Sequence, residues 1–395
     1  LERRGKSCII INLPCSSPPR INGIIIDSFT AESENCIFPP GLIEEIPELK
    51  EYKIIPDGPV SERIRDFREV ERIRFNCSRD LFKMNWDFFF VLFLISDAVQ
   101  HKFYDQLVSG TLRNDSEAIG AWRDLDEYVG WFVTNAPRNS VVFIMSDHGF
   151  SVRKKKFAVN RWLMEYGYLR AKSMRSNNLG FGIEISNFLV KHSKLLKIGS
   201  VVYQVLSKVL PVRPILQDIE PDFSHSVACA FGTDSGPVGG IYINTRERSK
   251  SGIVKPSEYE DIRSKIIDEL EELEDPKSGK KILRYVLRRE DVYFGEYLNR
   301  APDILIISDE YGITVKNLPV IFDGRIERND HAMEGILIAH GPDIKEGSKI
   351  EGAKIHDIAP TILHIFGLPV SKDIDGRVLK ELFKEDSEFT SREIK

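Results

Sequence analysis

Two short motifs in the sequence place an aspartate and a histidine directly after an apolar run. The four residues are Asp97, His101, Asp147 and His148. The first pair follows Phe88–Ile95 and is spaced by four residues, so both side chains face one way if a helix begins there. The second pair follows Val141–Met145, and Gly149 allows a tight turn after it. Carboxylate and imidazole donors gathered in this way favour Zn²⁺ or Mn²⁺ over Ca²⁺.

Each motif alone is a weak signal, because an acid near a histidine is frequent by chance. Asp97 also suits the role of a helix N-cap. A third histidine, His331, precedes a late apolar run, and a histidine in such a loop is more often structural or merely exposed.

The elements that must position these residues alternate between strands and helices. Short apolar runs without strict alternation predict buried strands over Ser7–Leu13, Gly23–Ile26, Asp87–Ile95, Val141–Met145, Gly240–Ile243, Asp303–Ile307 and Gly335–Ala339. Helical patterns cover Val60–Met84, Ser116–Asn135, Pro256–Glu274 and Asp357–Phe366. The sequence therefore predicts an α/β fold, a three-layer sandwich with a mostly parallel central sheet and helices on both faces. Ligands bind at the carboxyl edge of such a sheet.

The composition excludes several classes of protein. The chain has 395 residues, 42% of them hydrophobic and 29% charged, with a net charge of −5. A strongly basic nucleic-acid binder is excluded, and the longest apolar run, Phe88–Ile95, is far too short to span a membrane. Five scattered cysteines form no disulfide framework, which predicts reduced thiols and a cytoplasmic protein. Scarce glutamine with abundant Lys, Glu and Ile hints at a thermophilic source.

The segment Arg170–Gln217 differs from the rest of the chain. It holds eight Lys and Arg residues, and Glu184 is its only acidic residue. Its amphipathic pattern predicts a basic helical cap, inserted at about 170–220 within one domain that spans residues 1–395. Such a cap favours an anionic substrate or a membrane surface, and a solvated cap without a specific ligand is the alternative.

The ordered set of motifs resembles the alkaline phosphatase superfamily. The closest resemblance is to its type I phosphodiesterase/nucleotide pyrophosphatase branch. It rests on Asp97-x-x-x-His101, on Ser146-Asp147-His148-Gly149-Phe150 and on His331-x-Met-Glu-Gly. Further stretches agree in order: Asn160–Leu169, Gly239–Asn244, Gly341–Ile344, Asp357–Leu363, Gly367–Pro369 and Asp375–Gly376.

The resemblance implies a site for two metal ions. Asp97, His101 and His331 would hold one ion. Asp147 and His148 would hold the other, with an Asp and a nucleophilic Thr or Ser from the N-terminal part. Two such ions clamp an in-line phosphoryl transfer, and the hydroxyl forms a covalent intermediate.

The opening of the chain departs from the family pattern. Cys8–Leu13 and Pro18–Gly23 resemble the region downstream of the nucleophile. We therefore expect that the sequence is cut, and that the first strand and the nucleophile lie before Leu1. Two stretches offer substitutes: Asp27-Ser28-Phe29-Thr30, and Ser16-Ser17-Pro18-Pro19-Arg20 with its loose sulfatase pattern. Short-motif coincidence is the favoured interpretation of both.

Three functional hypotheses follow. The first is a metal-dependent hydrolase of small-molecule phosphoesters that contains zinc or manganese. The second is a non-catalytic homologue that binds a metal or a phosphate ligand, and the third is an interaction module with a decayed site. A sulfatase or a phosphomutase of the same superfamily also remains open. Arg153–Lys156 is either a phosphate contact or, more commonly, a solvated charge run, and Asn160 matches a structural position.

Overall fold

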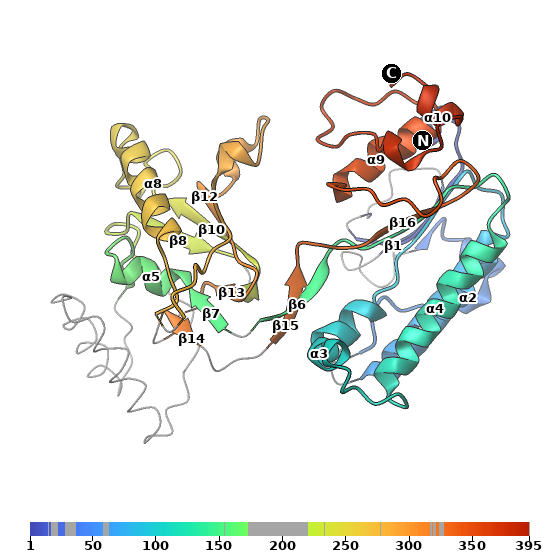
Figure 1. Ribbon diagram of the computed structural model, residues 1–395, viewed down its shortest axis with the longest axis horizontal. Coiled ribbons are helices and arrows are strands. Elements are labelled where there is room, and N and C mark those ends of the chain that lie inside the picture. Colours follow the sequence, from blue (N-terminus) through green and yellow to red (C-terminus); the bar gives the residue numbers. More distant parts are fainter. Residues whose placement is uncertain are drawn as a thin grey trace. The chain divides into compact units, whose positions relative to one another are not determined.

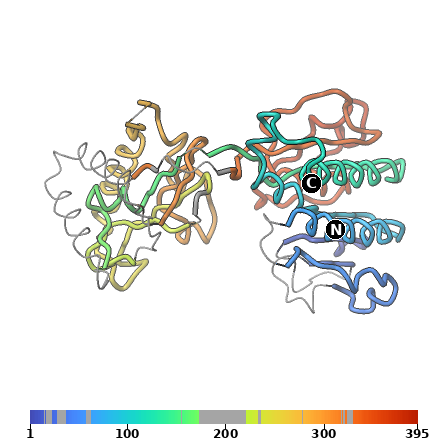
Figure 2. The backbone as a smooth tube through the Cα atoms, turned by 90° about the horizontal axis from the view of Figure 1, so that it is seen from below, coloured from blue at the N-terminus to red at the C-terminus, as the bar shows by residue number. Residues whose placement is uncertain are grey.

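The computed structural model describes most of the chain. The described residues are 1–14, 16, 23–27, 37–57, 63–153, 155–172, 220–232, 234–276, 278–316, 318, 321–323 and 328–394. The chain divides into two compact units: unit 1 comprises Leu1–Gly149 with Glu334–Lys395, and unit 2 comprises Phe150–Met333. Figure 2 follows this by colour, since the blue-to-teal start and the red end of the chain belong to the same unit.

A four-stranded sheet forms the base of unit 1. Its order is β3 (Ile37–Phe38), β2 (Ile24–Asp27), β1 (Cys8–Leu13) and β4 (Phe88–Val91). β1 pairs in parallel with β2 and with β4, while β3 is antiparallel to β2. The carboxyl ends of β1, β2 and β4 therefore share one edge, as expected from their unalternating apolar runs.

Helices pack against this part of the chain. They are α1 (Leu42–Glu45), α2 (Ile64–Phe82), α3 (Ile95–Ser109) and α4 (Glu117–Asn135), with 3₁₀ turns at Glu2–Arg4 and Pro47–Glu51. α2 and α4 lie side by side (Figure 1), and the Phe75 ring stacks on Tyr128 with centroids 4.2 Å apart. Ser116 caps α4 by accepting a hydrogen bond from the Ile119 N–H.

The remaining elements of unit 1 are β5 (Val142–Met145), at the end of its first chain segment, and the elements of its second segment, Glu334–Lys395. β5 pairs antiparallel with β16 (Leu337–His340). α9 (Ile358–Ile365), α10 (Glu388–Ser391) and the 3₁₀ turns Ile355–Asp357 and Lys380–Leu382 follow. Leu379 and Phe383, both fully buried, anchor the cluster that these elements share.

Unit 2 contains two four-stranded sheets, in which β7 (Lys155–Ala158) and β13 (Tyr311–Thr314) are parallel and the other pairs are antiparallel. One sheet has the order β11 (Tyr285–Arg288), β12 (Ile304–Ile307), β10 (Val238–Ile243) and β8 (Ala228–Phe231), and each neighbouring pair is antiparallel. A second sheet orders β14 (Phe322–Asp323), β7, β13 and β9 (Asp234–Gly236). β6 (Gly149–Arg153) pairs with β15 (Arg328–Ala332). The helices are α5 (Val159–Glu165) and α8 (Pro256–Glu271), with 3₁₀ turns at Arg289–Asp291 and Leu298–Arg300.

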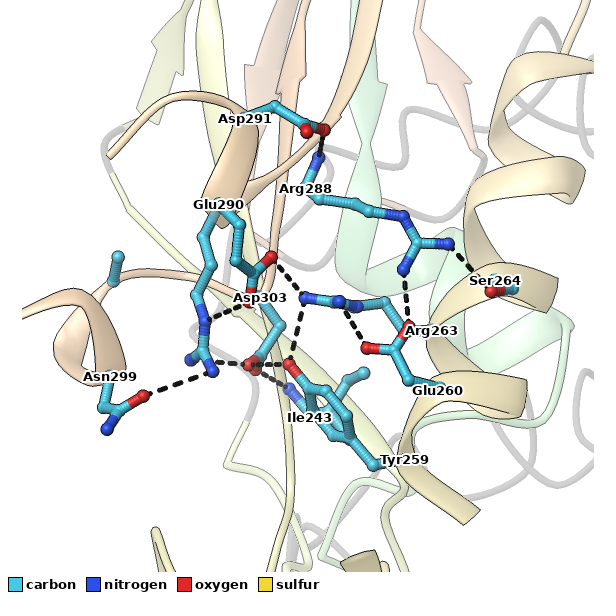
Figure 3. Close-up of polar contacts among 12 residues, drawn as sticks. Ile243, Tyr259, Glu260, Arg263, Ser264, Arg288, Glu290, Asp291, Asn299 and Asp303 are labelled. Carbon is cyan, nitrogen blue, oxygen red and sulfur yellow. Dashed lines mark hydrogen bonds and ion pairs between the residues drawn. The ribbon is translucent and has the colours of Figure 1, made fainter. Parts of the chain in front are cut away.

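A buried carboxylate ties the first sheet of unit 2 to α8. Asp303 is 1% exposed and accepts hydrogen bonds from the Ile243 N–H and the Tyr259 hydroxyl, each at 2.7 Å. Arg289 and Arg248 donate to the same carboxylate. Figure 3 shows Tyr259 reaching Asp303 from the helix side. Because several charge-assisted donors surround this one acid, β10, β12 and α8 are fixed to one another.

The mixed α/β class is confirmed, while the three-layer sandwich and the single domain stay predictions. The runs at 240–243 and 303–307 are strands, but they pair antiparallel instead of in a parallel sheet. The basic cap falls mostly on residues 173–219, outside the described residues. Within the described ranges, no helix combines the length and the apolar character that a bilayer span demands.

Candidate metal centre

Asp97 and His101 stand one helical turn apart near the start of α3. The helix begins at Ile95 with Leu94 as its N-cap, so Asp97 lies in the first turn and is not the N-cap. Nε2 of His101 lies 3.5 Å from Oδ1 of Asp97, and both side chains are partly exposed. The helix therefore presents a carboxylate and an imidazole on one side, accessible from solvent.

His148 approaches the same carboxylate from the end of β5. Its Nε2 lies 3.7 Å from Oδ1 of Asp97 and 3.6 Å from Oδ1 of Asp147. Its Nδ1 lies 3.1 Å from the carbonyl oxygen of Gly149. A carbonyl can only accept, so Nδ1 carries the proton in the neutral ring and Nε2 presents the lone pair. This is the tautomer that a metal-binding histidine needs.

The separations within this cluster are compatible with ligands of divalent ions. The three distances of 3.5, 3.6 and 3.7 Å exceed the length of a charge-assisted hydrogen bond, about 2.7–2.9 Å. Neighbouring ligand atoms on a tetrahedral zinc ion with bonds of about 2.0–2.1 Å lie about 3.4 Å apart. Carboxylate oxygens and imidazole nitrogens are donors that zinc and manganese accept. The residue types therefore fit divalent ions.

The turn that carries Asp147 and His148 is held tightly. The Ser146 hydroxyl accepts a hydrogen bond from the Ile336 N–H at 2.9 Å. A Cβ on Gly149 would lie 1.9 Å from the carbonyl oxygen of Glu334. Only glycine fits there, because of this close approach of a neighbouring backbone. Asp147 is the most exposed of the four side chains, at 72%.

His331 lies in unit 2 on β15. Its ring packs edge-on against Phe150 with centroids 5.2 Å apart. Its backbone N–H donates to the Asp330 carboxylate at 2.8 Å, and its carbonyl accepts from the Arg153 guanidinium at 2.6 Å. The position of this histidine within unit 2 is thus fixed through both its ring and its backbone.

The basic run at 153–156 is not a solvated charge run where the structure describes it. Arg153 is 2% exposed and donates to the carbonyls of Ser308, Asp309 and His331. Lys155 is paired with the buried Asp275. The run therefore serves the interior of unit 2, and burial lowers the pKa of Arg153 while nearby acids oppose that shift.

Other sequence candidates have structural roles. Asn160 is buried, and its amide group bonds to the backbone of Ala230 and to the Val315 carbonyl, which agrees with the structural position expected of it. The Ser16 hydroxyl donates to Asp27 and to the Leu13 carbonyl, as in an ordinary turn. The other members of the two substitute stretches, 17–20 and 28–30, lie outside the described residues.

Two buried polar residues near the centre escaped the sequence reasoning. Glu71 on α2 accepts a hydrogen bond from the Leu94 N–H, and the Asn12 amide donates to the Leu92 carbonyl, each at 2.9 Å. The signal for Glu71 is its place in the apolar stripe of α2, where Ile64, Phe67, Val70 and Leu81 are buried at helical spacing. Asn12 gives no such signal, since its contact depends on the pairing of β1 with β4.

The fold and the donor cluster define a mixed α/β protein with candidate metal ligands after two of its strands. The chain belongs to the type I phosphodiesterase / nucleotide pyrophosphatase family, whose model matches residues 49–318. The family suggested by the ordered motifs is thereby confirmed, and its members are in general hydrolytic phosphoesterases. The matched range contains Asp97, His101, Asp147 and His148 and ends before His331. Comparison with curated proteins and with solved structures gives no match.

Proposed function

We propose that the protein is a metal-dependent hydrolase of small-molecule phosphoesters, of the phosphodiesterase type, with a site for two divalent ions, zinc or manganese. Asp97, His101 and His331 are the ligands that we assign to one ion, on the order of the family motifs. Asp147 and His148 are the ligands that we assign to the second ion. Family membership supports the reaction class, and the residue types support the metal dependence.

One observation carries the proposal. Oδ1 of Asp97 has the Nε2 atoms of two histidines, His101 and His148, at 3.5 and 3.7 Å. A carboxylate that faces two imidazole nitrogens brings together the oxygen and nitrogen donors that a divalent ion such as Zn²⁺ accepts.

The residues of the chain have distinct tasks in this proposal. Asp97 supplies charge to the centre, His101 and His148 orient their Nε2 lone pairs, and the Gly149 carbonyl holds the His148 tautomer. When bound, divalent ions polarise a phosphoryl oxygen and lower the pKa of a hydroxyl nucleophile. A Thr or Ser nucleophile is part of the proposal, and we assign that role to no residue of this sequence.

Hydrolysis of bis-p-nitrophenyl phosphate by the natural full-length protein tests the proposal. We expect turnover that depends on added Zn²⁺ or Mn²⁺ and that disappears with a chelator. Asp97→Ala and His101→Ala should abolish it. Turnover that does not rise above a metal-only blank with Zn²⁺, Mn²⁺, Co²⁺ and Mg²⁺ would overturn the proposal.

Matched controls separate ligand loss from general damage. Asp115→Ala removes an exposed acid of unit 1 that pairs with Arg113, and His225→Ala removes an exposed histidine that pairs with Asp222. Both variants should keep full turnover. Parallel assays with p-nitrophenyl sulfate test the sulfatase alternative. Tight metal binding without turnover of any ester would instead favour the non-catalytic homologue.

A further inference from the structure

The start of α3 is capped from another helix. Its N-cap residue, Leu94, offers no side-chain hydrogen bond to the first turn. The Glu71 carboxylate on α2 lies at this end of the helix and accepts from the backbone N–H of Leu94 at 2.9 Å. A carboxylate at this end of a helix also interacts favourably with the helix dipole. The first turn of α3, which carries Asp97, is therefore defined by a residue distant in sequence.

Glu71 is itself held rigidly. It is 1% exposed and forms a buried ion pair with Arg74, which is fully buried. The Arg74 guanidinium also donates to the Tyr52 hydroxyl and to the carbonyls of Lys53 and Ile54. Burial raises the pKa of Glu71, and Arg74 with the N–H groups of α3 opposes that rise. A charged pair placed so deep is costly unless its geometry is maintained on every side.

The preceding residues of the same turn are fixed from β1. Asn12 is fully buried and has a left-handed backbone with φ of 65°. Its amide donates to the Leu92 carbonyl, while the Leu92 N–H donates to the Ile11 carbonyl at 3.1 Å. The link from β4 to α3 is thus clamped by Asn12 at its first residue and by Glu71 at its last.

We propose that Glu71, with Asn12, is a positioning residue that fixes the link between β4 and α3 and so sets the orientation of Asp97 and His101 toward a divalent ion. This inference rests on the proposed function, because it treats Asp97 and His101 as metal ligands. Neither Glu71 nor Asn12 contacts the ion. Removal of either residue frees the first turn of α3, and the ligands it carries lose their preorganised geometry.

Equilibrium binding of Zn²⁺ alone to the full chain provides the test, with Co²⁺ absorption as a report on geometry. Glu71→Gln should weaken Zn²⁺ binding about ten- to a hundredfold, the range found for outer partners of metal ligands. The visible Co²⁺ bands should change in shape as the ligand geometry loosens. Asn12→Gly keeps the left-handed backbone and removes one hydrogen bond, so it should weaken binding about three- to tenfold.

A matched control excludes a merely structural effect. Leu81→Ala removes a fully buried side chain from the same helix, α2, and leaves intact the hydrogen bonds that Glu71 and Asn12 make to the link. It should lower the unfolding temperature while it leaves the Zn²⁺ affinity and the Co²⁺ bands unchanged. If Glu71→Gln does not fold, the Zn²⁺ affinity and the Co²⁺ bands of Asn12→Gly decide whether the link positions the ligands.

Two outcomes overturn the inference in distinguishable ways. If Asp97→Ala abolishes Zn²⁺ binding while Glu71→Gln and Asn12→Gly bind like the wild type, the positioning role is wrong and the metal site stands. If Asp97→Ala binds Zn²⁺ as tightly as the wild type, the proposed metal site itself is wrong, and the positioning role is lost with it.

Discussion

The Nε2 atom of His148 lies 3.7 Å from Oδ1 of Asp97, although the two residues follow different strands. Asp97 comes from the first turn of α3, and His148 comes from the turn after β5. The same carboxylate oxygen faces Nε2 of His101 at 3.5 Å. Asp97 is therefore the residue that joins the two motifs into one cluster, and its loss should affect both.

This geometry predicts non-additive effects of substitutions at Asp97 and His148. Each of Asp97→Asn and His148→Gln should weaken Zn²⁺ binding by about 100-fold or more, beyond the range of outer partners. The double variant should bind little more weakly than the worse single variant, because the Asp97 carboxylate faces His148 and so couples the two ion sites. Titration calorimetry with Zn²⁺ measures all four proteins, with Asp115→Asn as the exposed control. If the loss of Zn²⁺ affinity in the double variant equalled the product of the two single losses, the two residues would act independently, which would contradict this prediction.

The sequence predicted the elements of this centre better than their packing. The four-residue spacing of Asp97 and His101 gave their shared helix face, because a helical period is local information. The strand before them ends at Val91 and not at Ile95, since the three residues after it form the link to α3. From the sequence, Glu71 stands out only as an acid within an apolar stripe. Its hydrogen bond from the Leu94 N–H could not be predicted, because that contact depends on how α2 packs.

The same limit applies in unit 2. The runs at 240–243 and 303–307 have strand composition, but composition does not encode strand direction, and they pair antiparallel. Arg153 belongs to a basic run that resembles solvated surface. Its burial depends on carbonyls of Ser308, Asp309 and His331, all far away in sequence. Long-range pairing of this kind leaves no periodic signal.

Trp162 should dominate the stability of unit 2. It is fully buried on α5 and stacks on Tyr166 with centroids 4.6 Å apart. Trp162→Ala should lower the free energy of unfolding by about 3–5 kcal/mol. Its indole N–H has no hydrogen-bond acceptor among the described residues. Trp162→Phe should therefore cost less than half as much, because an unsatisfied buried donor costs about 1–3 kcal/mol.

Urea unfolding followed by circular dichroism measures both Trp162 variants. The slope of the transition should stay unchanged, so that the shift in midpoint reports stability. A Phe variant as unstable as the Ala variant would show that the indole N–H contributes to folding after all.

The thiols of Cys77 and Cys229 should resist alkylation in the folded protein. Burial raises the pKa of each to about 12, and for Cys77 nearby acids add to this effect. At pH 8 the thiolate fraction of such a thiol is about 10⁻⁴, so iodoacetamide should react promptly only after unfolding. Because the unfolded thiols lose their protons first, stability should fall as the pH rises from about 9 toward 12.

Peptide mass spectrometry after timed labelling resolves the individual cysteines. Leu81→Ala provides an internal control, because Leu81 belongs to the same buried cluster as Cys77. It should speed the labelling of Cys77 and leave that of Cys229 unchanged. Fast labelling of both thiols in the native wild type would show that these positions open far more readily than their burial implies.

Loss of the Arg153 side chain should lower the stability of unit 2 and loosen the backbone at His331. Its guanidinium donates to the Ser308 carbonyl at 2.8 Å and to the His331 carbonyl at 2.6 Å. Arg153→Met leaves these carbonyls without their charged donor and should cost about 3 kcal/mol of unfolding free energy. Arg153→Lys keeps the charge but loses the planar fork, so its cost should be intermediate.

The Lys variant also tests whether His331 is a metal ligand. If it is, loosening the backbone of β15 should weaken Zn²⁺ binding about tenfold, as for other partners that orient a ligand. Arg161→Lys is the matched control, because Arg161 pairs with Glu165 on α5 of the same unit. It should leave Zn²⁺ binding unchanged. If Arg153→Lys and Arg161→Lys bind Zn²⁺ equally well and only Arg153→Lys is less stable, then Arg153 contributes to stability but not to metal binding. His331 would then not be a metal ligand.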